Sequence, residues 1–174
     1  AGRALPLRMS DEEDTLLLTA AGVLAGAAAW ALGYGVTYLA ASGRVAEQLE
    51  GLNGVTGLLG GNALPTWKAV TWLYFNAHFV DVRLVGFGGG ESVNFVSRTT
   101  GNAPLLYLLP PLVLLLSAGL TVRTMDVRSF RRALVGGAAS VLGYAAVVLA
   151  MTSLSTHALG TTLVGVGTVM AVGL

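Results

Sequence analysis

One uninterrupted apolar run constrains this chain more than any other feature. Residues 15–41, TLLLTAAGVLAGAAAWALGYGVTYLAA, contain no charged side chain. A helix of this length rises about 40 Å, more than the ~30 Å of a bilayer's hydrocarbon core. A cleaved signal peptide would need an apolar region of only about 7–15 residues. The run therefore predicts a membrane-spanning helix, and the acidic residues 11–14 before it suit the positive end of a helix dipole.

Three further apolar segments follow. Residues 103–122 and 133–155 are long and uncharged, whereas 158–174 is at the lower length limit for a span. Charged residues make up 11% of the chain, against roughly a quarter in soluble domains. We therefore expect an all-α integral membrane protein, a single domain over residues 1–174 with four transmembrane helices. Because the last run reaches the end of the sequence without a flanking charge, we also expect a longer natural product.

Prolines and a polar linker modify this pattern. Pro110 and Pro111 should kink the 103–122 helix or start its regular part near Leu109. In the linker 43–65, the segment RVAEQLEGL has helical spacing of apolar residues and predicts a short interfacial helix.

The segment 66–83, TWKAVTWLYFNAHFVDVR, is apolar but not free of charge. Its uncharged part, 69–80, would rise only ~18 Å as a helix, which is too short to span a bilayer unaided. Trp, Tyr and Lys favour the headgroup level. We expect a tilted, interfacial or half-inserted amphipathic helix over 66–83, with a full span as the alternative.

Wound as one helix, this segment has two informative faces. The aromatic residues are expected to contact lipid or a partner subunit: Trp67, Trp72, Phe75 and Phe79. A narrow polar stripe contains Tyr74, His78 and Asp81. The favoured interpretation is a local His78–Asp81 hydrogen bond at the membrane surface, and the alternative is a proton-handling or ion-binding site.

Small residues recur at helical spacing in two of the predicted spans. Small-xxx-small patterns let helix backbones approach closely, which drives helix association in lipid. The residues expected to pack in this way are Gly22, Gly26 and Gly33 in the first span, and Gly136, Ser140 and Gly143 in the third.

The spans lack the residues that most membrane chemistry needs. All charged residues fall outside the four apolar segments, which argues against a charged transport pathway. The absence of cysteine excludes thiolate chemistry, and two histidines are too few for a typical zinc site. Ser117 lacks a nucleophile-elbow pattern. We therefore expect no enzyme activity, no catalytic residue, no cofactor and no metal, and the net charge of +1 argues against nucleic acid.

Positive charge does not orient the chain. The loop 123–132 holds four arginines and is the best candidate for the cytoplasmic side. If 66–83 does not cross, the N-terminus joins this loop inside, and if it does cross, the N-terminus lies outside. Both topologies place six basic residues inside and four outside.

The run LPTWKAVTWLYFNAHFV (64–80), followed by a Gly-rich loop and Gly/Ala-rich spans, resembles small multi-pass membrane proteins of haloarchaea. It is also similar to membrane proteins of icosahedral haloarchaeal viruses. The resemblance implies a membrane location and a helical fold, and it transfers no catalytic residue.

Together these features predict a structural or assembly subunit of a larger membrane complex, such as a virion or cell-envelope assembly. Its expected partners are the lipid bilayer and other membrane, capsid or envelope subunits. A small homo-oligomeric channel or transporter that uses the His78/Asp81 stripe is the alternative.

Overall fold

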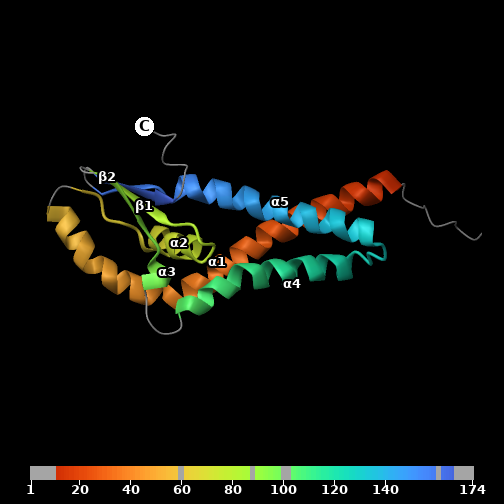
Figure 1. Ribbon diagram of the computed structural model, residues 1–174, viewed down its shortest axis with the longest axis horizontal. Coiled ribbons are helices and arrows are strands. Elements are labelled where there is room, and N and C mark those ends of the chain that lie inside the picture. Colours follow the sequence, from red (N-terminus) through yellow and green to blue (C-terminus); the bar gives the residue numbers. More distant parts are fainter. Residues whose placement is uncertain (1–10, 59–60, 87–88, 99–102, 160–161, 167–174) are drawn as a thin grey trace, which may run out of the picture.

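The computed structural model describes residues 11–58, 61–86, 89–98, 103–159 and 162–166, which are mostly helical. The helices are α1 (Asp11–Leu58), α2 (Thr66–Asn76), α3 (Phe95–Arg98), the 3-10 helix η1 (Ala103–Leu108), α4 (Leu109–Thr124) and α5 (Phe130–Leu154). The strands are β1 (Val82–Gly86), β2 (Gly89–Val93), β3 (His157–Leu159) and β4 (Thr162–Val166). Helices α1, α4 and α5 run along an elongated molecule (Figure 1). We call α2, α3 and the four strands, which gather at one end, the lobe.

Three helices are long and apolar enough to cross a membrane: Asp11–Val55, Pro104–Thr124 and Phe130–Leu154. The predicted helices over 15–41, 103–122 and 133–155 are therefore confirmed. The regular part of α4 begins at Leu109 with prolines in its first turn, as predicted. A proline costs least there, because the first amides of a helix have no intrahelical acceptor.

A fourth span over 158–174 is not confirmed, and an all-α fold does not describe the lobe. Residues 162–166 form β4 in an antiparallel sheet of order β2-β1-β4-β3, and 167–174 lie outside the described residues. Val82 of β1 pairs with Val93 on one side and Val166 on the other. The segment is rich in β-branched Thr and Val and is interrupted by glycine, which favours short strands over a helix.

The short helix predicted within 43–65 is not separate, because α1 continues without a break to Leu58. Its 48 residues form about 72 Å of helix, more than twice a hydrocarbon core. The orange part of α1 bends in Figure 1. This part of the sequence includes the Ser42–Gly43 pair, and Gly/Ser pairs are common sites of helix bending. Beyond α1, the Asn53 side chain clamps the returning chain through the Leu64 amide, at 2.7 Å, and the Leu64 carbonyl, at 3.2 Å.

Helices α1 and α5 approach each other most closely at their glycines. A Cβ built on Gly26 would overlap the Ser140 carbonyl, and one on Gly143 would overlap the Val23 carbonyl. A Cβ on Gly22 would lie 2.6 Å from the Gly136 carbonyl oxygen. We call this backbone-to-backbone contact the glycine seam. Helix α4 joins it through the Ser117 hydroxyl, which donates to the Ala25 carbonyl at 2.7 Å.

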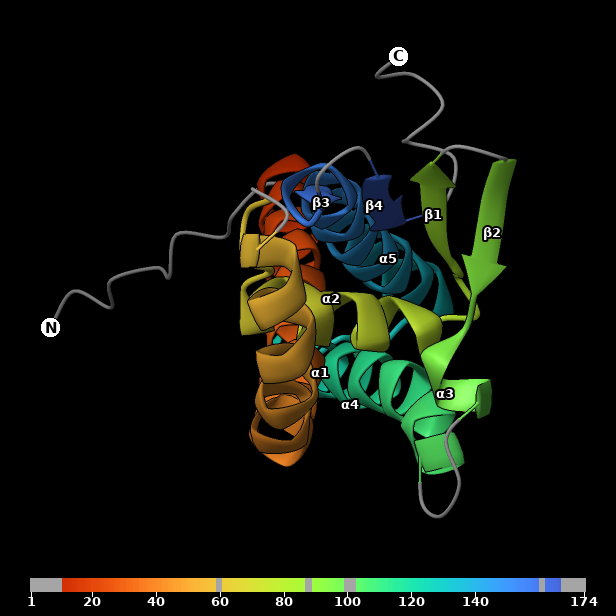
Figure 2. The ribbon, with the colours of Figure 1, turned by 90° about the vertical axis from the view of Figure 1, so that its left-hand side faces the viewer.

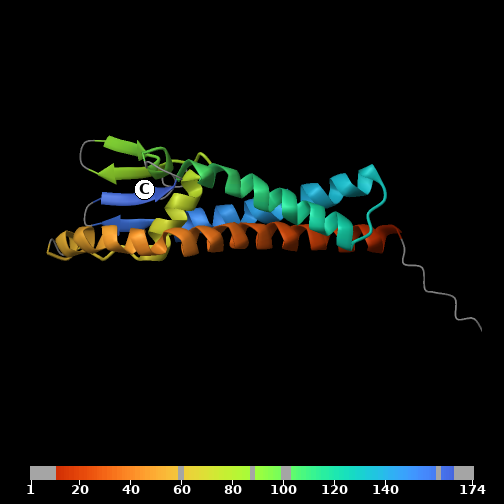
Figure 3. The same cartoon turned by 90° about the horizontal axis from the view of Figure 1, so that it is seen from below.

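Helix α2 lies across the bundle at the lobe end (Figures 2 and 3). It is 11 residues long and rises about 16 Å, so it cannot cross a bilayer. Residues 66–83 therefore form a short transverse helix followed by a turn and a strand, not one helix of spanning length. Arg132, at the end of the arginine-rich loop, and Asp14 form an ion pair at 3.6 Å. This ion pair places the start of α1 and the arginine-rich loop at the same end of the molecule.

We predict that Gly26→Leu disrupts the glycine seam. The new side chain cannot fit against the Ser140 carbonyl without separating the helices, so we expect a loss of at least about 1–3 kcal/mol of unfolding free energy. Thermal unfolding in detergent micelles, followed by tryptophan fluorescence, would measure the change. Gly137→Leu is the matched control, because Gly137 has nothing within 4 Å of a built Cβ. Equal melting temperatures for the two variants would contradict the prediction.

Candidate functional site

Side chains of the transverse helix α2 donate hydrogen bonds to backbone carbonyls at the C-terminal end of α5. The Trp72 indole Nε1 donates to the Ser155 carbonyl at 3.0 Å, and Lys68 Nζ donates to the Thr156 carbonyl. Carbonyls at a helix C-terminus have no intrahelical donor, so these side chains satisfy groups that would otherwise be orphaned. The Lys68 ammonium group therefore binds the C-terminal end of α5 within the chain.

Three side chains form a hydrogen-bonded cluster that is largely buried: Tyr74 of α2, Tyr144 of α5, and His78 of the turn that follows α2. The hydroxyls of Tyr74 and Tyr144 are 3.0 Å apart, and His78 Nε2 lies 2.6 Å from the Tyr144 hydroxyl. His78 Nδ1 lies 2.7 Å from the Tyr74 backbone carbonyl. Gly33 of α1 provides the space, because a Cβ there would overlap the Tyr74 hydroxyl. We call Tyr74, Tyr144 and His78 the Tyr–Tyr–His cluster.

Hydrogen-bond chemistry fixes the direction of every proton in this cluster. A carbonyl oxygen only accepts, so His78 Nδ1 carries a proton and donates to Tyr74. In the neutral ring Nε2 must then accept, and the Tyr144 hydroxyl donates to it. The Tyr144 oxygen accepts in turn from the Tyr74 hydroxyl. The neutral Nδ1–H tautomer therefore satisfies all three side chains.

Tyr74 and His78 lie outside the apolar spans, and burial shifts the pKa of each side chain toward its uncharged form. Burial raises the pKa of the Tyr74 hydroxyl, and its interactions with Tyr144 raise that pKa further. Burial also lowers the pKa of His78, with a partial opposing effect from its bond to the Tyr74 carbonyl. Both shifts favour the uncharged form, since a charge without compensation is costly in a poorly solvated site.

Aromatic side chains surround the cluster. The Trp30 ring meets the Tyr74 ring edge-on at 5.5 Å and stacks on the Tyr34 ring at 5.4 Å. The Trp30 indole nitrogen is buried and finds no acceptor among the described residues. The cluster therefore lies in a packed aromatic setting at the junction of α1, α2 and α5.

The predicted polar stripe does not exist as drawn from the sequence. Helix α2 ends at Asn76, so the chain turns before His78 and Asp81 can lie on one helical face. His78 turns inward to Tyr144, whereas the exposed Asp81 carboxylate accepts from Asn94 Nδ2 at 3.2 Å and Ser92 Oγ at 3.3 Å. The expected His78–Asp81 pair is therefore wrong.

Of the four aromatic residues predicted to contact lipid or a partner, two are buried and two are exposed. Trp72 and Phe75 are 4% and 1% exposed, packed against Leu49, Leu64 and Val82, so neither can contact lipid or a partner. Trp67 and Phe79 are 39% and 74% exposed and remain available. The predicted helix and α2 both start at Thr66, but α2 ends at Asn76 and the chain's own lobe covers one side of its aromatic surface.

Sequence reasoning missed two side chains that organise this region. Tyr144 is a lone tyrosine in a Gly/Ala/Val-rich span, and the signal was its hydroxyl, which needs a partner away from water. Asn76 is completely buried: its amide donates to the Val80 carbonyl at 2.8 Å and accepts from the Phe95 amide at 2.8 Å. No local pattern marked Asn76, because Val80 becomes its partner only where the chain turns after α2, and Phe95 comes from α3.

A second polar feature lies at the opposite end of the bundle. A cavity of about 360 Å³ there is lined by residues of α1, α5 and the loop between α4 and α5: Asp11, Asp14, Thr15, Leu18, Ser129, Arg131, Arg132 and Val135. Its two aspartates and two arginines balance in charge. Within the described ranges, no group of three His, Asp or Glu side chains could hold a metal ion.

The fold defines a mostly helical protein with three helices of membrane-spanning length and a small mixed lobe at one end. The chain belongs to a family of unknown function (DUF7978), whose family model matches residues 8–174. Neither the curated proteins nor the solved structures contain a match to it.

We predict that Tyr144→Phe destabilises the fold although it removes one oxygen only. It leaves His78 Nε2 without a donor and the Tyr74 hydroxyl without an acceptor, which costs about 1–3 kcal/mol for buried groups. Melting in detergent micelles would measure the loss. Tyr38→Phe is the control on α1, because the Tyr38 ring is partly exposed at 36%. An unchanged melting temperature for Tyr144→Phe would contradict the assigned bonds.

A second prediction concerns pH. Because the folded-state pKa of His78 is lowered, its contribution is fully present above the unfolded value of about 6.5. As pH falls below that value, the unfolded chain binds a proton that the folded chain rejects, so the unfolding free energy falls until the folded pKa is passed. The melting temperature should therefore decline more steeply below about pH 6.5 in the natural protein than in His78→Asn.

The control for this experiment is His157→Asn. Among the described residues, the His157 side chain makes one exposed contact, with the Asn62 carbonyl at 3.4 Å. This variant should keep the acid-induced decline of the natural protein. If His78→Asn declines as steeply as the natural protein, His78 is not the group responsible.

Proposed function

We propose that this protein is a non-enzymatic, multi-pass membrane protein that serves as a structural or assembly subunit of a larger membrane complex. Three apolar helices, of which α4 runs antiparallel to α1 and α5, support the multi-pass assignment, since charged residues gather at the two ends of the bundle. With the arginine-rich loop on the cytoplasmic side, the lobe lies on the far side of the membrane.

The observation that carries the assembly role is the uncovered tip of α1. Val55 and Leu58 are 57% and 89% exposed, and the tip reaches the end of the molecule farthest from the start of α1 (Figure 1). Because the hydrocarbon core accommodates about 20 helical residues, lipid around the spans does not cover this surface. An apolar surface held in water is typical of a protein–protein contact.

Glycines on the same segment support this proposal. Gly51, Gly54 and Gly57 lie inside a regular helix, where each costs about 0.8–1 kcal/mol relative to alanine. A Cβ at any of them would meet nothing within 4 Å. Among the described residues these glycines relieve no crowding, and they would let another helix approach closely.

The Tyr–Tyr–His cluster favours a second candidate, a small proton-conducting channel or transporter. Its hydrogen bonds form a continuous chain from Tyr74 to His78, which is the arrangement a proton relay needs. Proton flux into liposomes would test this candidate. A flux abolished by His78→Ala would replace the assembly role with transport.

We predict that Gly54→Leu releases the complex without damaging the subunit. The leucine meets open space in this chain and raises helix propensity, so the subunit should melt at the same or a higher temperature. The natural protein, extracted in mild detergent, should co-purify with another protein in a fixed ratio, and the variant should lose that partner. Particle mass by light scattering and partner identity by mass spectrometry provide the measurements.

Gly119→Leu is the matched control, because Gly119 also has nothing within 4 Å but lies on α4 within a span. It should retain the partner. The assembly role would be contradicted by a natural protein that purifies alone, or by a Gly54→Leu particle of unchanged mass. A homomeric particle with a water-filled axis would instead favour the channel.

A further inference from the structure

Phe79 holds a backbone conformation that favours glycine. Its φ is 61°, and it directly follows the last turn of α2. The Phe79 amide donates to the Asn76 carbonyl at 3.0 Å, and the Val80 amide donates to the Phe75 carbonyl at 3.2 Å. These two bonds are the pattern of a Schellman helix end, whose left-handed position is usually glycine. A phenylalanine is strained there, because its Cβ crowds the backbone.

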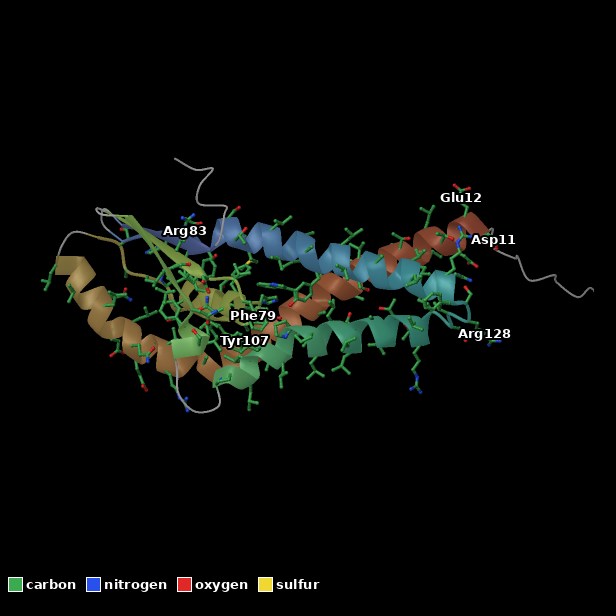
Figure 4. All side chains as sticks on the ribbon, in the orientation of Figure 1. Asp11, Glu12, Phe79, Arg83, Tyr107 and Arg128 are labelled. Atoms are coloured by element: carbon green, nitrogen blue, oxygen red, sulfur yellow. The ribbon has the colours of Figure 1, made fainter. Side chains whose placement is uncertain are left out.

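Burial does not explain the phenylalanine, because the side chain is 74% exposed. Instead its ring stacks flat on the Tyr107 ring of η1, with centroids 4.5 Å apart and planes 3° from parallel (Figure 4). The Tyr107 hydroxyl donates to Asn94 Oδ1 at 3.2 Å, which fixes the second ring to the lobe. The fold therefore holds a rigid aromatic pair on its surface with one face of Phe79 uncovered.

The position of this pair matches one boundary of the hydrocarbon core. Along η1 and α4, Tyr107 lies about 25 Å from Arg123, which is close to one hydrocarbon thickness from the charged end of the bundle. Leu105 and Leu108 beside it are 62% and 63% exposed and continue into the exposed leucines of α4. The apolar surface of the span thus runs without interruption to the aromatic pair.

The chain's other amphipathic aromatics lie toward the same boundary. From the acidic start of α1, Trp30 and Tyr34 are about 24 and 30 Å along the helix. All three tryptophans and five tyrosines of the sequence lie between residues 30 and 144, and none lies on 1–29 or in the loop 123–132. Tryptophan and tyrosine favour the interface between headgroups and hydrocarbon.

We propose that the Phe79–Tyr107 pair is a membrane anchor, in which the Phe79 ring enters the boundary between headgroups and hydrocarbon and holds the lobe on the bilayer. The anchor rests on the multi-pass assignment proposed above. The strained turn at Phe79 is kept because it presents the ring outward, toward lipid, at the level where α2 lies across the bundle.

Site-directed spin labelling tests the depth of this ring, and the absence of native cysteine makes single-cysteine variants straightforward. Phe79→Cys, Leu115→Cys and Arg83→Cys would each be labelled with a nitroxide in phosphatidylcholine nanodiscs. Accessibility to oxygen and to a water-soluble nickel chelate reports depth. We expect Leu115 deep in the hydrocarbon, Arg83 in water, and position 79 between them at the headgroup boundary.

The controls separate the two proposals. A water-exposed label at Leu115 would overturn the multi-pass assignment. A deep label at Leu115 together with a label at 79 as water-exposed as Arg83 would overturn the anchor alone. If the label at 79 is shielded from both oxygen and nickel chelate, a protein partner covers the site, and the lipid anchor is wrong.

A matched pair of substitutions tests the strain. Phe79→Ala and Phe79→Gly both remove the stacked ring, but only glycine relieves the left-handed conformation. In detergent, the glycine variant should melt about 2–4 °C above the alanine variant. In nanodiscs, both variants should exchange the amides of residues 77–80 faster than the natural protein. A glycine variant that melts below the alanine variant, or unchanged exchange, would contradict the proposal.

Discussion

The contact between the backbones of α1 and α5 is the constraint on which the rest of the structure depends. Lipid removes the hydrophobic driving force between helices, so their association relies on close packing and on polar contacts. Gly26 and Gly143 each place a carbonyl of the other helix where a side chain would otherwise stand. This approach aligns Asp14 with Arg132 at one end and brings both Gly33 and Tyr144 to the Tyr74 hydroxyl at the other.

The transverse helix α2 connects the packed helices α1 and α5 to the rest of the lobe. It can lie across the bundle because Trp72 and Lys68 satisfy the carbonyls at the end of α5, and because Tyr74 finds a partner in Tyr144. Buried polar groups are tolerated when each has a partner, and here the partners come from different elements. The same closure leaves two surfaces uncovered, the tip of α1 and the Phe79–Tyr107 pair, and both proposed contacts are there.

Local chemistry made the helices and their packing residues predictable. Uncharged length defines the spans, prolines mark the start of α4 at Leu109, and glycine spacing identifies Gly22, Gly26 and Gly143, which lie in the seam. The errors have physical causes as well. Glycine normally marks the kind of turn that ends α2, but Phe79 occupies that position here. The sequence therefore predicts a helix that continues to residue 83, and such a helix would place His78 beside Asp81. Hydropathy predicts a helix for the last apolar run, although its residues 162–166 suit the strand β4, which pairs with β1.

The sequence by itself determined the helices at 15–41, 103–122 and 133–155 and the glycines at which two of them pack, because hydropathy and side-chain size act over neighbouring residues. Only the tertiary structure decided which side chains those helices expose. Trp72 and Phe79 belong to one short aromatic segment, yet one is enclosed by α1 and the sheet while the other faces outward. His78 found its partner 66 residues away on α5 rather than three residues along its own segment. Burial and hydrogen bonding depend on elements distant in the chain, and no local pattern encodes where those elements meet.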